Sequence, residues 1–562
     1  MTAAAHRDDR AAPRPPDEVM RLARMGAFFP TRLSFMRTLL RRLSAERAVV
    51  HRAVWEIDDA GFGRAVYSVP LGGHTYSLVA FSTPLAPEDR TDRVIAEAWD
   101  TSYVLYDGVP APGDLDRLQA NAPRQEAGRF SATDLVLCRA NRSVRLFEHV
   151  ADCLSRGVQP PADVINATGY LMRTTAVYGN GKFGIADRAR IETRPGLSGP
   201  FAAEMLAVWL VRGFTIDLVE HIARSRAPDS FVPLDRALKR HLGIGNATGL
   251  GMAPFLVSHP ILLDRWMTAR ETALARVRAV PHASPEARDK AEELIARVRR
   301  HLDQWRVADA RQSRRIEVLR REVADLAALA TRDWLAGPFP WDRLVAASMR
   351  HSLECQELVV SLVLEPNGAL VDDLADTMAS AGRPRLRPEM PVAALTDLVD
   401  SRFAWALGID FEDREATDRF WYVSEEKLEP RLGSRHQEPG ADKEMPLDIA
   451  RQVQALRREL AAAPASQTVA EFLLARPAHR HAVRRVQTAA DHPYAEIRDN
   501  LIAADCLPID MLRCKLSFFG AAKFDPKSDR WTRITMFQGA PLLDEIATPL
   551  ADDWWLSALE GL

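Results

Sequence analysis

The chain has 562 residues, of which 47% are hydrophobic and 27% charged, as is usual for a globular protein with a full core. This length corresponds to about two to four domains or to one large multilayer unit. Its 74 basic and 76 acidic residues give a net charge of −2. That balance argues against nucleic acid as the main partner, because binding the phosphate backbone needs an excess of basic residues.

The five cysteines are scattered and include no CxxC pair, which indicates a reducing compartment and a cytoplasmic protein. No apolar run reaches the ~18 residues of a membrane-spanning helix, so we expect no transmembrane segment. Residues 1–20 are polar and rich in proline, and we interpret them as a disordered tail.

Residues 21–45 form a basic segment without an acidic residue, and Pro30 breaks the helix that its pattern predicts. We interpret it as docked helices with a solvated arginine face. Contact with a membrane surface is the alternative. The arginines are Arg21, Arg24, Arg32, Arg37, Arg41 and Arg42.

Strand patterns follow within a predicted α+β domain over residues 21–130. Residues 49–57 and 65–69 flank Asp58-Asp59-Ala60-Gly61, which has the composition of a hairpin turn. A second hairpin turns at Gly72-Gly73, and residues 94–106 are a further strand candidate. Consecutive hairpins predict an antiparallel β-meander.

A helical domain is predicted over residues 131–270, with helices at 143–154, 163–177 and 200–225. The last of these is apolar almost all round, which is typical of a buried central helix.

Ser284-Pro285 has the composition of a helix start. A heptad pattern follows and predicts one coiled-coil-like helix over residues 284–333, about 70 Å long at ~1.5 Å per residue. This seam (298–326) can pair within the chain or form a homo-oligomer. A hairpin of two helices that turns at 309–313 is the alternative.

The remaining residues, 338–562, predict a mostly helical domain that ends in a β-hairpin. Helices are expected at 341–365, 392–407 and 447–462, and residues 424–444 are polar and irregular. The terminal hairpin would join strands 512–519 and 531–537. The fold class is therefore α+β and predominantly α-helical.

The first candidate site lies in the predicted helix 163–177. Asn166, Tyr170 and Arg173 would share one face of this helix, and an amide, a phenol and a guanidinium together suit a carboxylate or phosphate. The helix leads into a glycine-framed turn that presents Asn180 and Lys182, where backbone N–H groups can bind an anion. A helix C-cap and a tight turn, with Arg173 paired to an acid, are the alternative.

A second glycine cluster, residues 243–251, includes Asn246 as a further candidate for substrate binding. It does not fit a dinucleotide-binding fingerprint, because an amphipathic helix precedes it where that motif needs a strand. We expect a helix C-cap at Gly243 followed by small residues that allow close packing.

The third candidate is the segment around residues 350–361, in which Arg350, Glu354, Glu357 and Ser361 would share one helix face. His351, Glu354 and Glu357 are the candidate catalytic residues, because imidazole and carboxyl groups exchange protons readily. A solvated polar face with an Arg350–Glu354 pair is the alternative. Further candidates for an anion pocket lie on or near the last predicted hairpin: Lys515, Lys523 and Arg533.

Three functions follow as hypotheses, and the third of them is a membrane-surface adaptor that uses residues 21–45. The first is a soluble intracellular enzyme that binds a small anionic metabolite, a carboxylate or a phosphate, in a pocket between helices. The second is a non-enzymatic interaction protein that oligomerises through the heptad helix. No motif assigns a reaction type, a metal or an organic cofactor.

Overall fold

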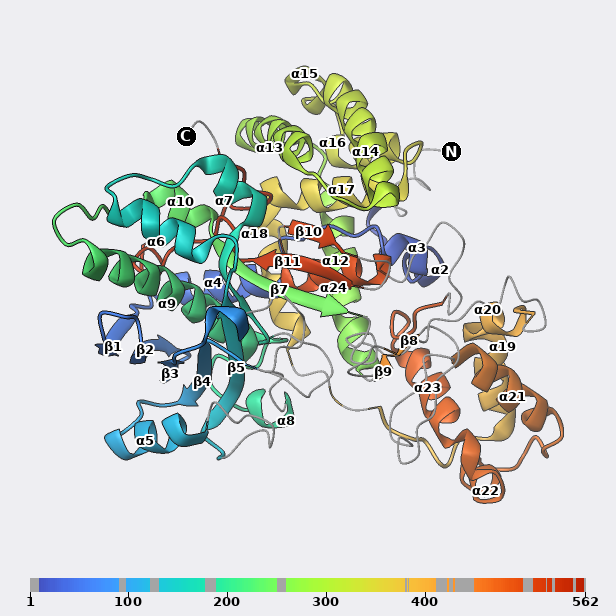
Figure 1. The fold of residues 1–562 in the computed structure, drawn as a ribbon. Helices are drawn as coiled ribbons and strands as arrows, with labels where there is room; N and C mark the ends of the chain where they lie inside the picture. The colour runs from blue at the N-terminus through green and yellow to red at the C-terminus, as the bar shows by residue number, and fades with distance from the viewer. Residues whose placement is uncertain are drawn as a thin grey trace.

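The structure is a computed structural model, and it describes residues 10–89, 98–121, 131–176, 188–249, 259–379, 382, 384–410, 422–423, 428–429, 449–498, 509–521, 523–527, 531–548 and 552–559. One nine-stranded sheet is its centre, with the strand order β1-β2-β3-β4-β5-β6-β7-β11-β10 (Figure 1). The strands are β1 (His51–Ile57), β2 (Gly63–Leu71), β3 (His74–Ser82), β4 (Thr101–Asp107), β5 (Asp134–Arg142), β6 (Tyr170–Thr174), β7 (Gly243–Gly249), β10 (Lys523–Pro526) and β11 (Trp531–Met536).

The predicted antiparallel meander is confirmed, since β1 to β6 pair antiparallel in chain order. Only the pair β6–β7 is parallel, and β11 then pairs antiparallel with β7 and with β10. The sheet therefore combines strands from residues 51–249 with strands from residues 523–536. It runs across the domain limits predicted at 130 and 338.

The predicted central helix is α9 (Ala202–Arg226), which is buried along most of its length and contacts strands β3 to β7. Further helices of this half are α5 (Pro112–Asn121), α6 (Phe147–Ser155), α7 (Ala162–Thr168), α8 (Arg188–Ile191) and α10 (Arg236–His241). The predicted helix at 143–154 corresponds to α6, which packs against α9.

The predicted helix over 163–177 is wrong in its second half. α7 ends at Gly169, whose φ of 80° is left-handed and accommodates glycine without strain. Tyr170–Thr174 then continue as strand β6 between β5 and β7. Asn166 lies on a helix while Tyr170 and Arg173 lie on a strand, so the three do not share a helix face.

Residues 243–249 of the second glycine cluster form strand β7 rather than a helix cap with a packing loop, and residues 250–251 lie outside the described residues. A Cβ atom on Gly243 would lie 2.2 Å from the Met536 carbonyl oxygen, and one on Gly245 would lie 2.7 Å from the Tyr170 ring. Side chains at these positions would clash with the adjacent strands β11 and β6. The glycines therefore allow β7 to lie closely between its neighbours.

The predicted long helix over 284–333 is instead a hairpin of two helices, α13 (Pro285–Gln304) and α14 (Ala310–Leu329), which pack on each other. The Ser284 side chain caps α13 as predicted, and the Asp309 side chain caps α14 by accepting from the Gln312 N–H. The cap at Asp309 therefore starts a second helix inside the heptad pattern, which had predicted one continuous helix. The apolar seam side chains are buried within the chain: Val298, Leu302, Trp305, Ile316, Leu319, Val323 and Leu326.

The predicted helix over 341–365 is also divided, into α16 (Pro340–Ser348) and α17 (Leu353–Leu364), because the Ser352 side chain caps α17. α12 (Pro260–Arg278), α15 (Arg332–Leu335), the 3₁₀ helix η4 (Glu365–Asn367), α18 (Gly368–Val371) and the 3₁₀ helix η5 (Asp372–Met378) complete this helical layer.

A smaller helical unit has its own hydrophobic core and lies apart from the sheet in Figure 1. It contains α19 (Val392–Arg402), α20 (Ala404–Leu407), α21 (Ile449–Ala461), α22 (Val469–Ala475), the 3₁₀ helix η6 (Pro477–His479) and α23 (Arg480–Asp491). Helices predicted at 392–407 and 447–462 are thus present, and the short strands β8 (Tyr422–Val423) and β9 (Leu428–Glu429) pair with each other. Most of the segment predicted as irregular, 424–444, lies outside the described residues.

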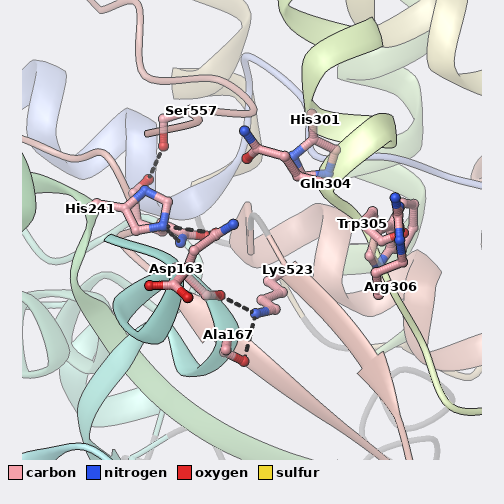
Figure 2. A pocket seen from close by; sticks show the side chains of 11 residues that line it. Asp163, Ala167, His241, His301, Gln304, Trp305, Arg306, Lys523 and Ser557 are labelled. Atoms are coloured by element: carbon pink, nitrogen blue, oxygen red, sulfur yellow. Dashed lines mark hydrogen bonds between the residues drawn. The ribbon is translucent and has the colours of Figure 1, made fainter. Parts of the chain in front are cut away.

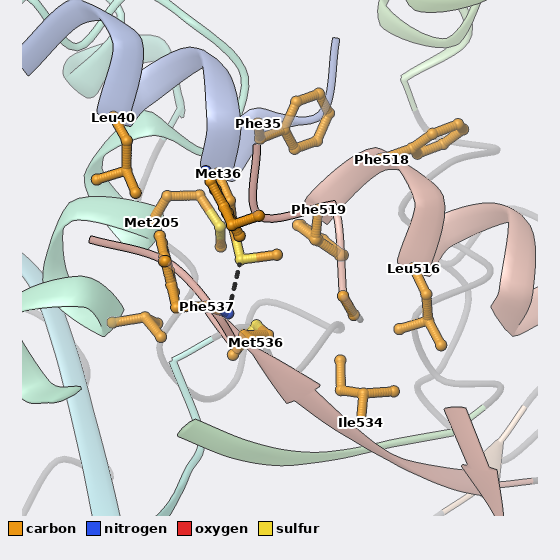
Figure 3. Packing of buried hydrophobic residues seen from close by; sticks show 14 of the residues in the cluster. Phe35, Met36, Leu40, Met205, Leu516, Phe518, Phe519, Ile534, Met536 and Phe537 are labelled. Atoms are coloured by element: carbon orange, nitrogen blue, oxygen red, sulfur yellow. Dashed lines mark hydrogen bonds between the residues drawn. The ribbon is translucent and has the colours of Figure 1, made fainter. Parts of the chain in front are cut away.

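The C-terminal hairpin was predicted correctly only in its second strand. Residues 512–519 belong to helix α24 (Asp510–Phe519), and β11 pairs instead with β10. In Figure 3, Phe518 and Phe519 of α24 pack near Phe35, the first residue of α4 (Phe35–Ala45), above the β11 residues Ile534 and Met536. A helix that ends in two aromatic residues closes the core between the sheet and the N-terminal helices.

The N-terminal segment is built into the molecule. Residues 10–20, expected in a disordered tail, include α2 (Pro16–Val19), and Val19 and Met20 are buried. α3 (Leu22–Met25) and α4 (Phe35–Ala45) follow on either side of Pro30. The predicted solvated arginine face is wrong: Arg24 and Arg37 are buried and pair with Glu357 and Glu365 across the core.

Candidate functional site

A cavity of about 370 Å³ opens between α7, α10, α13 and the strand β10 (Figure 2). We call it the Lys523 pocket. Its walls come from five parts of the chain that are far apart in sequence. The lining residues are Asp163, Asn166, Ala167, His241, His301, Gln304, Trp305, Arg306, Lys523, Gln538 and Ser557.

Lys523 starts strand β10 and caps the end of α7. Its ammonium donates to the carbonyl oxygens of Asn166 at 2.8 Å and Ala167 at 3.2 Å, which are among the last carbonyls of that helix. Such carbonyls lack partners within their own helix and carry partial negative charge. Burial lowers the pKa of Lys523. Among the described residues Lys523 forms no salt bridge. The acid that acts on its charge is Asp525, which is itself paired with Lys527.

His241 ends α10 and lies at the floor of the pocket, where it is 4% exposed. Its Nε2 atom is 3.2 Å from Asn166 Oδ1 and 2.8 Å from Gln538 Nε2. A protonated Nε2 donates to Asn166, whereas an unprotonated Nε2 accepts from Gln538. The tautomer of this ring therefore selects which carboxamide it engages and which one remains for a ligand.

His301, on α13, faces the same space from the other side (Figure 2). Burial and the charge of Lys523 lower the pKa of both imidazoles to about 4. Both rings are therefore neutral at pH 7 and can accept a proton. A cation without a salt bridge among the described residues thus lies beside two neutral bases.

Hydrogen-bonding side chains occur from the floor of the pocket to its mouth. Gln538 and His241 are the most buried of its polar side chains, while Asp163, Gln304 and Arg306 are exposed. With both imidazoles neutral, the lining carries two cations and one acid, a net charge of +1. An anion is therefore favoured over a cation as occupant.

The predicted substrate-binding residues divide between three places. Asn166 lines the pocket through α7. Tyr170, Arg173 and Asn246 are buried on the neighbouring strands β6 and β7, where the Asn246 amide donates to the Thr174 carbonyl oxygen at 2.6 Å. Asn180 and Lys182 lie outside the described residues. Of the members of this set that the structure describes, only Asn166 lines the pocket.

The predicted catalytic residues lie on and just before α17, and none of them lines the Lys523 pocket. Glu357 is fully buried and accepts from Arg14 at 2.9 Å, from Arg24 at 2.7 Å and from Arg270. These guanidiniums outweigh the effect of burial and hold the pKa of Glu357 well below its ordinary value. A carboxylate with these partners is held ionised, which does not suit proton transfer at neutral pH.

Glu354 and His351 have separate partners. Glu354 lies 3.5 Å from Arg315 and 3.7 Å from Arg513, and His351 Nδ1 is 4.0 Å from a Glu322 oxygen. The alternative of a solvated face is also wrong, because Glu357 and Ser361 are buried. Arg350 precedes the cap of α17, so it is not on the same helix as Glu354.

Sequence reasoning had singled out Lys523 as well as Asn166, but it missed His241, His301, Arg306, Gln538 and Ser557. These residues belong to no motif, and they converge only because β10 and β11 join the sheet beside β7. The one available signal was Lys523 itself, placed on or near the predicted hairpin.

The described part of the chain contains no group of three or more His, Cys, Asp and Glu side chains that could hold a metal ion. Nor do the described residues contain a helix with the length and apolar character that a membrane span requires.

Comparisons of the chain with family models, with curated proteins and with solved structures found no match.

Proposed function

We propose that the protein is an enzyme that binds a small anionic metabolite in the Lys523 pocket. One observation carries the proposal: a lysine that donates to two carbonyl oxygens, and forms no salt bridge among the described residues, lines a cavity beside two neutral imidazoles. An anion that replaces solvent next to this ammonium gains a charge-assisted hydrogen bond. Arg306, at the mouth, adds a second positive charge.

His241 and His301 are the candidates for proton transfer. A general base must be unprotonated at the working pH and within hydrogen-bonding reach of its substrate. Both imidazoles are unprotonated at pH 7, because their pKa values are about 4. They take the role that was predicted for His351, Glu354 and Glu357, which do not line the cavity.

The test is a thermal-shift titration with inorganic phosphate, citrate and neutral glycerol, using wild type, Lys523→Gln and Lys290→Gln. Glutamine keeps a donor for the α7 carbonyls but removes the charge, and Lys290 is a matched surface lysine paired with Glu293. At about 100 times its Kd an anion stabilises the folded state by ~2.7 kcal/mol. We expect this stabilisation in wild type and Lys290→Gln, and its loss in Lys523→Gln. Equal responses in all three proteins would contradict the proposal.

Calorimetry tests the role of the histidines. An anion beside neutral imidazoles favours their protonated forms, so its binding near pH 6 takes up protons. The observed heat should then vary with the ionisation enthalpy of the buffer, and this variation should shrink in His301→Gln. A buffer-independent heat for a bound anion would remove both histidines from the proton-transfer role.

The alternative function, oligomerisation through residues 298–326, has less support because the seam side chains are buried inside the chain. Leu319→Ala should lower the unfolding free energy by about 2–4 kcal/mol, whereas Val318→Ala, at a half-exposed neighbour, should change it little. Sedimentation should give the same mass for both variants and wild type. A lower mass for folded Leu319→Ala would support the alternative.

A further inference from the structure

Resting on the proposed function, we infer that the anion bound in the Lys523 pocket is polyhydroxylated, with one charged end and a hydroxyl-bearing body. The first reason is the composition of the lining. Nine of its eleven residues carry hydrogen-bonding side chains, and its carbon surface comes from Ala167, Trp305 and the stems of the polar side chains. The indole N–H of Trp305 already donates to the Phe524 carbonyl oxygen, so its ring presents carbon to the cavity.

An apolar acid would fit this lining badly. A fatty or aromatic body would remove amides, imidazoles and a hydroxyl from water without giving them partners, and each unpaired polar group opposes binding. The hydroxyl groups of a polyhydroxylated body can instead form hydrogen bonds with the same polar groups, in place of the water molecules.

The distribution of charge along the pocket gives the second reason. Arg306 is exposed at the mouth and Lys523 is half-buried, whereas the floor consists of the uncharged groups of His241 and Gln538. A ligand whose charged group contacts Lys523 and Arg306 therefore places its body against amides and an imidazole. Neutral hydroxyls match that floor, while a second charge there would lack a counterion.

The third reason is that His241, at the floor of the pocket, has two alternative hydrogen-bond partners. His241 engages either Asn166 or Gln538, and the other carboxamide is left to the ligand. A hydroxyl both donates and accepts, so it pairs with whichever side the amide presents. A carbonyl or carboxylate only accepts and lacks this adaptability.

The cavity volume of about 370 Å³ lies at the low end of the ~300–1,000 Å³ usual for small-molecule sites. A sugar phosphate or a sugar acid has a suitable size and the required chemistry. The lining does not select between the two head groups, which share a negative charge next to hydroxyl groups.

The experiment is calorimetric titration of the full chain with matched ligands. Glucose 6-phosphate is compared with hexyl phosphate, and gluconate with hexanoate, so that each pair shares its head group and differs in hydroxyls. Glucose serves as the uncharged control. We expect the hydroxylated member of at least one pair to bind about tenfold tighter than its alkyl partner. The pair that binds more tightly identifies the head group.

The outcomes separate the two proposals. Equal binding of hydroxylated and alkyl anions would overturn this inference and leave the anion site standing. No binding by any anion would overturn the proposed function, and binding of glucose as tight as glucose 6-phosphate would do the same.

Two variants locate the effect. Asn166→Ala, at a half-buried position, should reduce the preference for the hydroxylated ligand, while Lys523→Gln should weaken both members of a pair alike. Gln538→Met, at the buried floor, repeats the first measurement if it folds. A preference unchanged in Asn166→Ala and Gln538→Met would contradict the placement of the hydroxyls.

Discussion

Two groups of charged side chains in this molecule differ in whether each charge has an oppositely charged partner within the chain. In the first, which we call the Glu357 cluster, the guanidiniums of Arg14, Arg24 and Arg270 surround the carboxylates of Glu271 and Glu357. In the Lys523 pocket, the ammonium has only carbonyl oxygens as partners among the described residues, and open space beside it. Arginine is the usual choice for buried, multiply bonded ion pairs, whereas lysine is a compact charge whose pKa responds to its surroundings.

The difference teaches how to distinguish a structural charge from one that awaits a ligand. The Glu357 cluster joins the N-terminal segment to α12 and α17, and its carboxylates are fully buried. Its ionic partners are all supplied by the chain. The pocket offers hydrogen-bonding groups to solvent and lacks a matching anion, so an external molecule can complete it.

Removing a carboxylate from the Glu357 cluster should have the largest effect. Glu357→Gln leaves the guanidiniums of Arg14, Arg24 and Arg270 with Glu271 and the partly exposed Glu18 as their acids. Breaking a buried ion pair costs about 3–5 kcal/mol. Urea denaturation should report a loss of this size, while the ligand-induced thermal shift stays as in wild type. A stability change below about 1 kcal/mol would show that the cluster is not the structural device described here.

The pH dependence of stability should show an intermediate effect that originates in the pocket. The pKa of His241 is about 4 in the folded chain against 6.5 as its ordinary value. Folding thus opposes protonation, and the resulting stability is full above pH 6.5 and decreases as the pH falls toward 4. Between about pH 7 and pH 4.5, wild type should lose about 2 kcal/mol more than His241→Gln. Parallel curves for the two proteins, measured by urea denaturation, would contradict a buried neutral imidazole.

The smallest effect on stability is expected at Glu354, which belongs neither to the Glu357 cluster nor to the Lys523 pocket. Its contacts with Arg315 and Arg513 are long, at 3.5 and 3.7 Å, so Glu354→Gln should change the unfolding free energy by less than about 1 kcal/mol. The thermal shift produced by an anion should not change either. If Glu354→Gln abolished the anion-induced thermal shift, α17 would have to be counted as part of the candidate site.

Local signals in the sequence predicted much of the fold. Alternating patterns and turn residues gave the hairpins from His51 to Ser82, and apolar content gave the buried α9. The errors arose where tertiary pairing decided the outcome. Residues 170–174 were assigned to a helix, and only the positions of β5 and β7 make them a strand.

The candidate site was much less predictable than the fold. Its residues range from Asp163 to Ser557, and no spacing between them is fixed by a motif. Asn166 and Lys523 were singled out because their residue types suit an anion. His241 and His301 belong to the site because the fold brings them to the cavity, where burial and the charge of Lys523 keep them neutral. A sequence pattern contains neither piece of information.

The position of β11 in the sheet has a consequence for synthesis of the chain. Gly249 of β7 pairs with Trp531 of β11, which emerges from the ribosome some 280 residues later. At about 5–20 residues per second, the nascent β7 edge waits about 15–60 s for its partner. An unpaired edge is a template for association with other chains, so this interval is when the protein most needs protection. The arrival of β10 and β11 ends the interval and delivers Lys523, so the step that completes the sheet also brings the lysine to the pocket.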